Sequence, residues 1–107
     1  MNLPHIIAEL VKAQDNYDST AYANCFSETA LVFDEGKTYS GRNEIKQWIK
    51  NANEKYKTVM QPIEYTETEK ETILKAKVSG NFDGSPVVLK YHVEIVNGLI
   101  QSLNVTE

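Results

Sequence analysis

The chain has 107 residues, of which 41% are apolar and 24% are charged, and its formal net charge at pH 7 is −4. This length is typical of one domain with a single hydrophobic core, and no apolar run approaches the ~20 residues that a membrane-spanning helix needs. The excess of acidic residues, without a cluster of lysines or arginines, argues against a nucleic-acid partner.

Two segments near the N-terminus have the spacing of amphipathic helices. The first carries apolar residues at the i, i+3, i+4, i+7 and i+8 positions of one helical face: Leu3, Ile6, Ile7, Leu10 and Val11. A second, shorter helix is expected after Asn16, with Asp18 or Ser19 as its N-cap. The apolar stripe of this second helix would consist of Tyr22, Cys25 and Phe26.

A strand and a third helix are expected next. The run from Ala30 to Glu35 is short, rich in β-branched and aromatic residues and closed by Gly36, which favours a strand. The polar tract that follows is interpreted as a loop. Gly41 and Glu44 then stand three residues apart, as the N-cap and N3 residues of a helix do. The apolar stripe of this helix is formed by Ile45, Trp48, Ile49, Ala52 and Tyr56.

Four further strands are predicted where the apolar period changes from 3.6 to 2, at residues 58–67, 72–82, 86–96 and 99–105. Turns are expected between them at Glu69-Lys70, Asp83-Gly84 and Asn97-Gly98, the last being the preferred pair of a type I′ hairpin. In the 86–96 strand, one face is apolar: Val87, Leu89, Tyr91, Val93 and Ile95.

The opposite face of that strand carries Lys90, His92 and Glu94, so one side of the sheet is apolar and the other polar. The three helices are the elements available to cover the apolar side. The sequence therefore predicts a single α+β domain over residues 1–107, with the order α-α-β-α-β-β-β-β.

The tract FSETALVFDEGKTYSGRNEIKQWI, from Phe26 to Ile49, resembles the signature region of the NTF2-like superfamily, and in particular its SnoaL-like branch. Its features are a short helix ending in Phe, a strand, a loop closing on Tyr-x-Gly-Arg, and a helix with Ile and Trp. The resemblance implies a cone, in which a strongly curved, mainly antiparallel sheet wraps around the helices and leaves a pocket at its open end. The superfamily includes ketosteroid isomerases, polyketide cyclases, dehydratases, limonene-epoxide hydrolases and nuclear transport factors, so the fold alone does not define the function.

The resemblance to the isomerases also implies roles for single positions. Their general-base aspartate corresponds to Asp34, and their second hydrogen-bond donor, a protonated acid on a late strand, falls near Tyr91. The tyrosine donor on their first helix corresponds to Leu10, which has no donor group. The lost donor argues against steroid isomerisation, whereas a base opposite a phenol suits a related proton transfer.

Asp34 is the first catalytic candidate, and its orientation is left open by the sequence. A carboxylate at the mouth of a pocket can abstract a proton or activate water if burial raises its pKa. The tripeptide Asp34-Glu35-Gly36 equally suits an ordinary acidic turn after a strand. If Leu31 and Phe33 face the helices, alternation turns Asp34 outward and makes Glu35 the inward carboxylate.

Four aromatic residues are candidates for contact with a ligand. Tyr91 shares a strand face with aliphatic residues and is expected to be internal, where its hydroxyl needs a partner, either a ligand or a backbone carbonyl. Trp48, Tyr65 and Phe82 would bind a ligand as the walls of an open pocket, or form ordinary core if the pocket is closed.

No metal or cofactor site is predicted. His5 and His92 are the only histidines, and the sequence has no His-x-His, HExxH or Cys/His pairing. His92 is expected on the polar face of its strand, as a solvated or interface residue. Cys25 is the only cysteine, which excludes an internal disulfide and favours a cytoplasmic location. Because it lies in the apolar stripe of the second helix, it is expected to be a core residue.

Three functions remain. The first is a cofactor-independent isomerase, cyclase or hydrolase that acts on a small hydrophobic carbonyl compound by acid–base catalysis through Asp34 and Tyr91. The second is a pocket that binds a small hydrophobic molecule without turnover, and the third is a protein-interaction domain that uses its sheet. The resemblance also implies a homodimer that packs sheet against sheet, and Val88 and Val96 interrupt the polar outer face of their strand in agreement with it.

Overall fold

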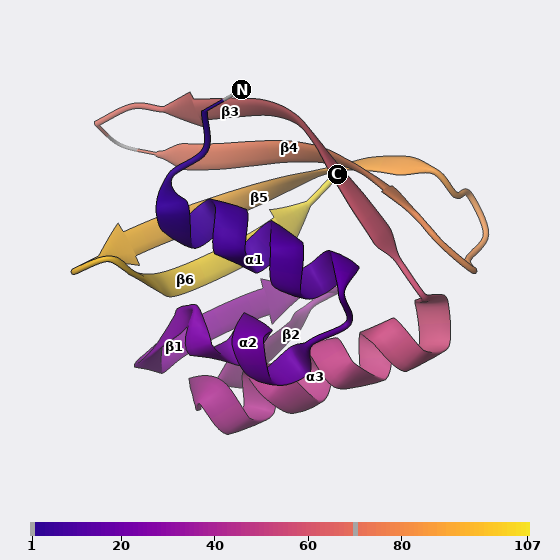
Figure 1. Ribbon diagram of the computed structural model, residues 1–107, viewed down its shortest axis with the longest axis horizontal. Coiled ribbons are helices and arrows are strands. Elements are labelled where there is room, and N and C mark those ends of the chain that lie inside the picture. Colours follow the sequence, from indigo (N-terminus) through magenta and orange to yellow (C-terminus); the bar gives the residue numbers. More distant parts are fainter. Residues whose placement is uncertain (1, 70) are drawn as a thin grey trace.

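The computed structural model describes residues 2–69 and 71–107, and within these it has three helices and a six-stranded sheet (Figure 1). The helices are α1 (His5–Asp15), α2 (Ser19–Asn24) and α3 (Gly41–Tyr56). The strands are β1 (Phe26–Asp34), β2 (Lys37–Ser40), β3 (Val59–Glu67), β4 (Thr72–Ser79), β5 (Val87–Val96) and β6 (Leu99–Thr106). The predicted α+β class is confirmed, while Lys70 of the expected Glu69-Lys70 turn lies outside the described residues.

The sheet has the order β2-β1-β6-β5-β4-β3 and is mixed, mainly antiparallel. Among the strand pairs of the described residues, only β1–β6 is parallel, and this pair joins the N-terminal hairpin to the C-terminal meander. The helices cover one face of the sheet (Figure 1): α2 and α3 pack against β1, and α1 packs against β3. No helix in the described part of the chain is long and apolar enough to cross a membrane.

The alternation predicted for the strands is confirmed, and it places the core between the sheet and the helices. Leu74 of β4 and Leu103 of β6 are fully buried on the inner face, while Val88 on the outer face of β5 is 43% exposed. Ile7 and Leu10 of α1 are buried against this inner face, as the helical spacing predicted. Burying a side chain of this size stabilises the fold by roughly 1.5–3 kcal/mol.

The predicted element order was wrong in one respect, because residues 37–40 form strand β2 rather than a loop. This short strand pairs antiparallel with the end of β1, Leu31 with Ser40 and Asp34 with Lys37. The turn between them, Glu35-Gly36, has positive φ at both residues (51° and 76°), as a two-residue type I′ hairpin requires. The strand is a short edge of the sheet in which three of four residues are exposed and only Tyr39 is partly buried, so alternation could not reveal it.

The boundary between α2 and β1 also differs from the prediction. The second helix ends at Asn24, and Phe26 begins β1 instead of extending the helical stripe. The backbone N–H of Ile100 donates to the carbonyl of Cys25 at 2.9 Å, and Phe26 pairs with Ile100 in the parallel register. Pairing with β6 therefore determines where the helix ends, which local spacing does not reveal.

A small polar network ties together the ends of α1 and α3 and the start of β3. The side chain of Gln14 is buried, and its Nε2 donates to Oδ1 of Asn53 at 3.0 Å and to Oγ1 of Thr58 at 2.6 Å. The carboxylate of Asp15 accepts the backbone N–H of Met60 at 2.9 Å. These bonds hold three elements in one arrangement beside the cavity described below.

Candidate functional site

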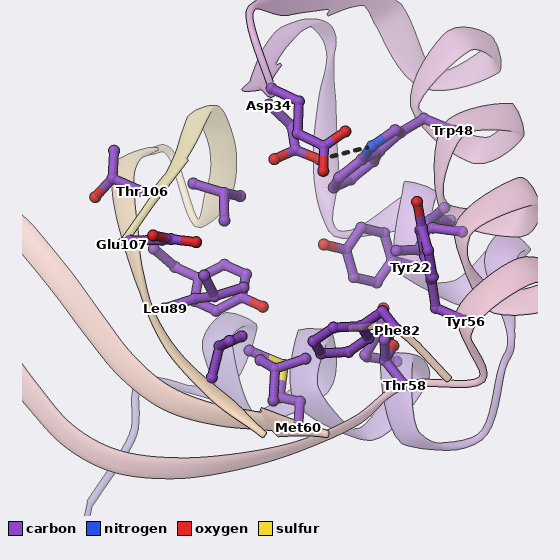
Figure 2. A pocket seen from close by; sticks show the side chains of 18 residues that line it. Tyr22, Asp34, Trp48, Tyr56, Thr58, Met60, Phe82, Leu89, Thr106 and Glu107 are labelled. Atoms are coloured by element: carbon purple, nitrogen blue, oxygen red, sulfur yellow. Dashed lines mark hydrogen bonds between the residues drawn. The ribbon is translucent and has the colours of Figure 1, made fainter. Parts of the chain in front are cut away.

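A cavity of about 410 Å³ lies between the inner face of the sheet and the helices (Figure 2). This volume falls within the range of ligand pockets in proteins. The residues that contribute apolar walls are Ile49, Ala52, Met60, Val78, Val87, Leu89 and Val105. Aromatic rings complete the walls: Tyr22, Trp48, Tyr56, Phe82 and Tyr91. Polar groups also reach the cavity, among them Asp34, Glu35, Gln14 and Thr58.

Asp34 points inward, which answers the question that alternation left open. Val32, two residues earlier, is fully buried, whereas Phe33 is 38% exposed on the other face of β1. Asp34 therefore shares the inner face with Val32 and lines the cavity. Glu35 also reaches the cavity, but it lies in the exposed turn to β2 with φ of 51°.

The Asp34 carboxylate is held by Trp48 on α3, whose indole Nε1 donates to Oδ2 at 3.3 Å (Figure 2). The pKa of Asp34 is raised above its ordinary value of 3.8, mainly because burial removes water from the charged form and further because Glu35 is nearby. The hydrogen bonds from Trp48 and from the backbone at Glu35 stabilise the ionised form and lower the pKa, without cancelling the rise. A more basic carboxylate is a better acceptor for a proton taken from a ligand.

Tyr91 lines the same cavity from the middle of β5. Its side chain is 9% exposed, and its pKa is raised by burial first and then by the charges of Asp34 and Asp15. Within residues 2–69 and 71–107, no group forms a hydrogen bond with its hydroxyl, so the backbone carbonyl considered as a partner is not found. The phenol is therefore a free donor in a largely apolar space.

Two of the three residues predicted to form the ligand-binding walls line the cavity. Trp48 is partly buried, and its ring lies 5.6 Å from that of Tyr39 and 6.1 Å from that of Tyr22. Phe82 contacts Tyr56 edge-on, with 6.0 Å between ring centroids. Each of these side chains presents an aromatic surface to the cavity.

Tyr65, the third, does not line the cavity. It lies on β3 five residues beyond the cavity residue Met60, roughly 16 Å along an extended strand. There it pairs with Leu74 and packs against the core. The prediction placed Tyr65 on the correct face of the sheet but at a part of the strand that the cavity does not reach.

Tyr22 is the site residue that sequence reasoning missed, because it was interpreted as part of an apolar stripe. Its side chain is 3% exposed and lines the cavity, and Figure 2 shows its hydroxyl directed into that space. The hydroxyl itself is the signal that could have identified it, since phenylalanine would fill a purely structural stripe position equally well.

A second cavity of about 410 Å³ adjoins the first and shares Asp34, Glu35, Trp48, Ala52 and Tyr56 with it. Its other walls are more polar and come from β2 and the outer side of α3, including Lys37, Glu44 and Lys55. The Asp34–Trp48 pair therefore lines both cavities.

No group of three His, Cys, Asp or Glu side chains is placed to hold a metal ion in the described part of the chain. Cys25 is buried, and burial raises the pKa of its thiol to about 11. It does not line either cavity.

Neither a protein-family model nor a curated protein matches the sequence significantly. Among solved structures, the putative polyketide cyclase from Sinorhizobium meliloti is 35% identical, with a TM-score of 0.92 over 97% of this chain and 95% of that chain. A protein with a ketosteroid isomerase-like fold from Catenulispora acidiphila, solved with trimethylamine, is 16% identical, with a TM-score of 0.87 over 99% of this chain and 87% of that one. An NTF2-like protein from Cytophaga hutchinsonii is 15% identical, with a TM-score of 0.78 over 94% and 85% of the two chains. The last two similarities show the fold alone.

Proposed function

The chain belongs to the SnoaL-like branch of the NTF2-like superfamily, and from that membership we propose that it is a cofactor-independent enzyme acting on a small hydrophobic carbonyl compound. The proposed reaction is an isomerisation, cyclisation or hydrolysis by acid–base catalysis. Asp34 is the general base and Tyr91 is the hydrogen-bond donor to the carbonyl oxygen.

The observation that supports this proposal most strongly is the shared cavity of these two groups. A partly buried carboxylate with a raised pKa and a phenol without a protein partner line one cavity. An acceptor for a proton and a donor for an oxygen are the two groups that enolisation of a ketone requires.

In the proposed first step, the Asp34 carboxylate takes a proton from the carbon next to the carbonyl. The electron pair of the broken C–H bond forms a carbon–carbon double bond, and the carbonyl π pair moves onto the oxygen. Tyr91 donates a hydrogen bond to that oxygen and stabilises its developing negative charge. In an isomerisation, the enolate is conjugated with a further carbon–carbon double bond, and the protonated Asp34 returns the proton to the far carbon of that system. In a cyclisation, the enolate carbon attacks a second carbonyl carbon, whose π pair moves onto its oxygen, and the protonated Asp34 gives its proton to that alkoxide.

Deuterium exchange tests the first step without knowledge of the natural substrate. A panel of hydrophobic cyclic ketones is incubated with the protein in D₂O, and loss of the α-proton signal is followed by NMR. We expect catalysed exchange for at least one ketone and a decrease of roughly 10²–10⁴-fold in Asp34→Asn, the range that a general base contributes. Glu94→Gln is the matched control, because Glu94 is exposed on β5 away from the cavity.

Exchange that persists unchanged in Asp34→Asn would overturn the assignment of the base, and loss of exchange in Glu35→Gln instead would transfer the role to the neighbouring residue. A ketone that raises the melting temperature without any exchange would favour the alternative function, binding of a small hydrophobic molecule without turnover.

A further inference from the structure

Tyr22 is a buried phenol that the proposed reaction does not yet use. It is 3% exposed, and its pKa is raised by burial first and then by the proximity of Tyr91, Cys25 and Asp34. Within the described ranges, 2–69 and 71–107, its hydroxyl forms no hydrogen bond. The hydroxyl faces the cavity, and a phenylalanine would fill the same packing position without placing a polar group there.

Aromatic packing determines where this hydroxyl points. The Tyr22 ring packs against Phe26, with 5.6 Å between the ring centroids, and edge-on against Trp48, with 6.1 Å between the centroids. The same Trp48 donates its indole N–H to Asp34. The indole therefore positions both the phenol and the carboxylate, and Figure 2 shows the Tyr22 hydroxyl and the Asp34 carboxylate directed toward the same interior.

Tyr22 and Tyr91 approach the cavity from different elements, α2 and β5. We propose that Tyr22 donates a hydrogen bond to the ligand's oxygen together with Tyr91, so that the site takes an enolisable ketone held by two phenols with its acidic carbon facing Asp34. The role of Asp34 in this inference rests on the proposed function, whereas the role of Tyr22 as a donor can be tested by binding alone.

A second phenol donor would also compensate for Leu10, which stands at the position that corresponds to the tyrosine donor of the isomerases. Leu10 is 1% exposed in the core and does not line the cavity. A donor supplied from α2 would replace the one that α1 lacks. The site would then keep two donors to one oxygen while taking them from different elements.

The experiment compares two probes of nearly equal shape, 2-tetralone, which has a carbonyl oxygen, and tetralin, which lacks it. Their dissociation constants are measured by calorimetry for the unaltered protein, Tyr22→Phe and Tyr91→Phe. Tyr17→Phe is the control, because Tyr17 is 46% exposed and lines neither cavity. We expect 2-tetralone to bind Tyr22→Phe roughly two- to tenfold more weakly than it binds the unaltered protein, the effect of one hydrogen bond, with tetralin unaffected.

Equal affinity of Tyr22→Phe and the unaltered protein for 2-tetralone would overturn the inference, as would an equal weakening for both probes, which would indicate lost packing. Deuterium exchange of 2-tetralone separates this result from the proposed function. Exchange that depends on Asp34 but not on Tyr22 would support Asp34 as the base and contradict the role of Tyr22 as a second donor. If 2-tetralone binds more tightly than tetralin only when Tyr22 is present, but no exchange occurs, then Tyr22 is a donor and the proposed catalytic function is wrong.

Discussion

At the scale of single residues, the raised pKa of Asp34 has a consequence for stability. The raised pKa means that the folded protein binds the proton of the Asp34 carboxyl group more tightly than the unfolded chain does. Protonation of Asp34 therefore stabilises the fold. This stabilisation is complete below pH 3.8, the pKa of the unfolded chain, and is lost as the pH rises through the pKa of the folded protein. Asp34→Asn removes the buried charge while its side-chain oxygen still accepts from Trp48. We therefore expect the variant to melt at a higher temperature than the unaltered protein near neutral pH, with the difference shrinking toward pH 3.8.

Thermal unfolding followed by circular dichroism across this pH range checks the expectation. A variant that is less stable near neutral pH would mean that the Asp34 carboxylate stabilises the fold. In that case burial would not be the dominant influence on its pKa.

The indole of Trp48 provides a second prediction at this scale. Its hydrogen bond at 3.3 Å lowers the pKa of Asp34, so Trp48→Phe should raise that pKa further while keeping an aromatic ring in the wall. If Asp34 is the base, the pH at which ketone exchange reaches half its maximal rate should move upward in this variant. An unchanged pH profile with a folded protein would show that the indole does not act on the carboxylate.

At the scale of elements, the parts that sequence predicted well are those in which one face is buried. The alternation in β5 and the spacing in α1 follow directly from a buried inner face, and both are found. The edge strand β2 has four residues, of which Tyr39 alone is partly buried, so it is too short to show an alternating pattern. The start of β1 at Phe26 is determined by parallel pairing with β6, a contact between residues 74 positions apart that no local window contains.

Gly80 gives a prediction about the packing of these elements. A Cβ added there would stand 2.6 Å from the backbone oxygen of Tyr56, at the end of α3, and 3.2 Å from Cα of Thr58. Backbone atoms cannot move away as a flexible side chain can, so Gly80→Ala should destabilise the protein by about 1–3 kcal/mol. Urea unfolding measures the loss.

Gly84→Ala is the matched control, because a Cβ at Gly84 meets nothing within 4 Å. Its only penalty is the left-handed backbone, with φ of 87°, which costs about 1 kcal/mol. A Gly80→Ala loss no larger than that of Gly84→Ala would show that the chain relaxes around the added methyl group.

At the scale of the whole molecule, the cavity could be predicted only in part. Asp34, Trp48, Phe82 and Tyr91 meet at one cavity although they lie on four separate segments of the chain. The resemblance and alternation indicated their faces, but how far along each strand the cavity extends depends on packing between elements. For this reason Tyr65 was included wrongly and Tyr22 was missed.

We propose that the protein forms a homodimer through the outer face of its sheet. On β5 this face exposes Val88 and Val96, which are 43% and 44% accessible. It also places Lys75 of β4 directly opposite Lys90 of β5. Acidic residues of a second copy would reduce the repulsion between these two positive charges. Light scattering should return twice the chain mass of 12.1 kDa, and Val88→Glu, which puts a charge on this face, should shift the protein toward the monomer. A mass of 12.1 kDa for the unaltered protein at high concentration would contradict the proposal.

The measurement that tests the central claim most directly is the pH dependence of ketone exchange beside a titration of the Asp34 carboxyl carbon by NMR. If Asp34 is the base, both curves should have the same midpoint, it should lie above 3.8, and the exchange rate should rise with pH because only the ionised form accepts a proton. An exchange rate that does not follow the ionisation of Asp34, or a midpoint at or below 3.8, would contradict the account.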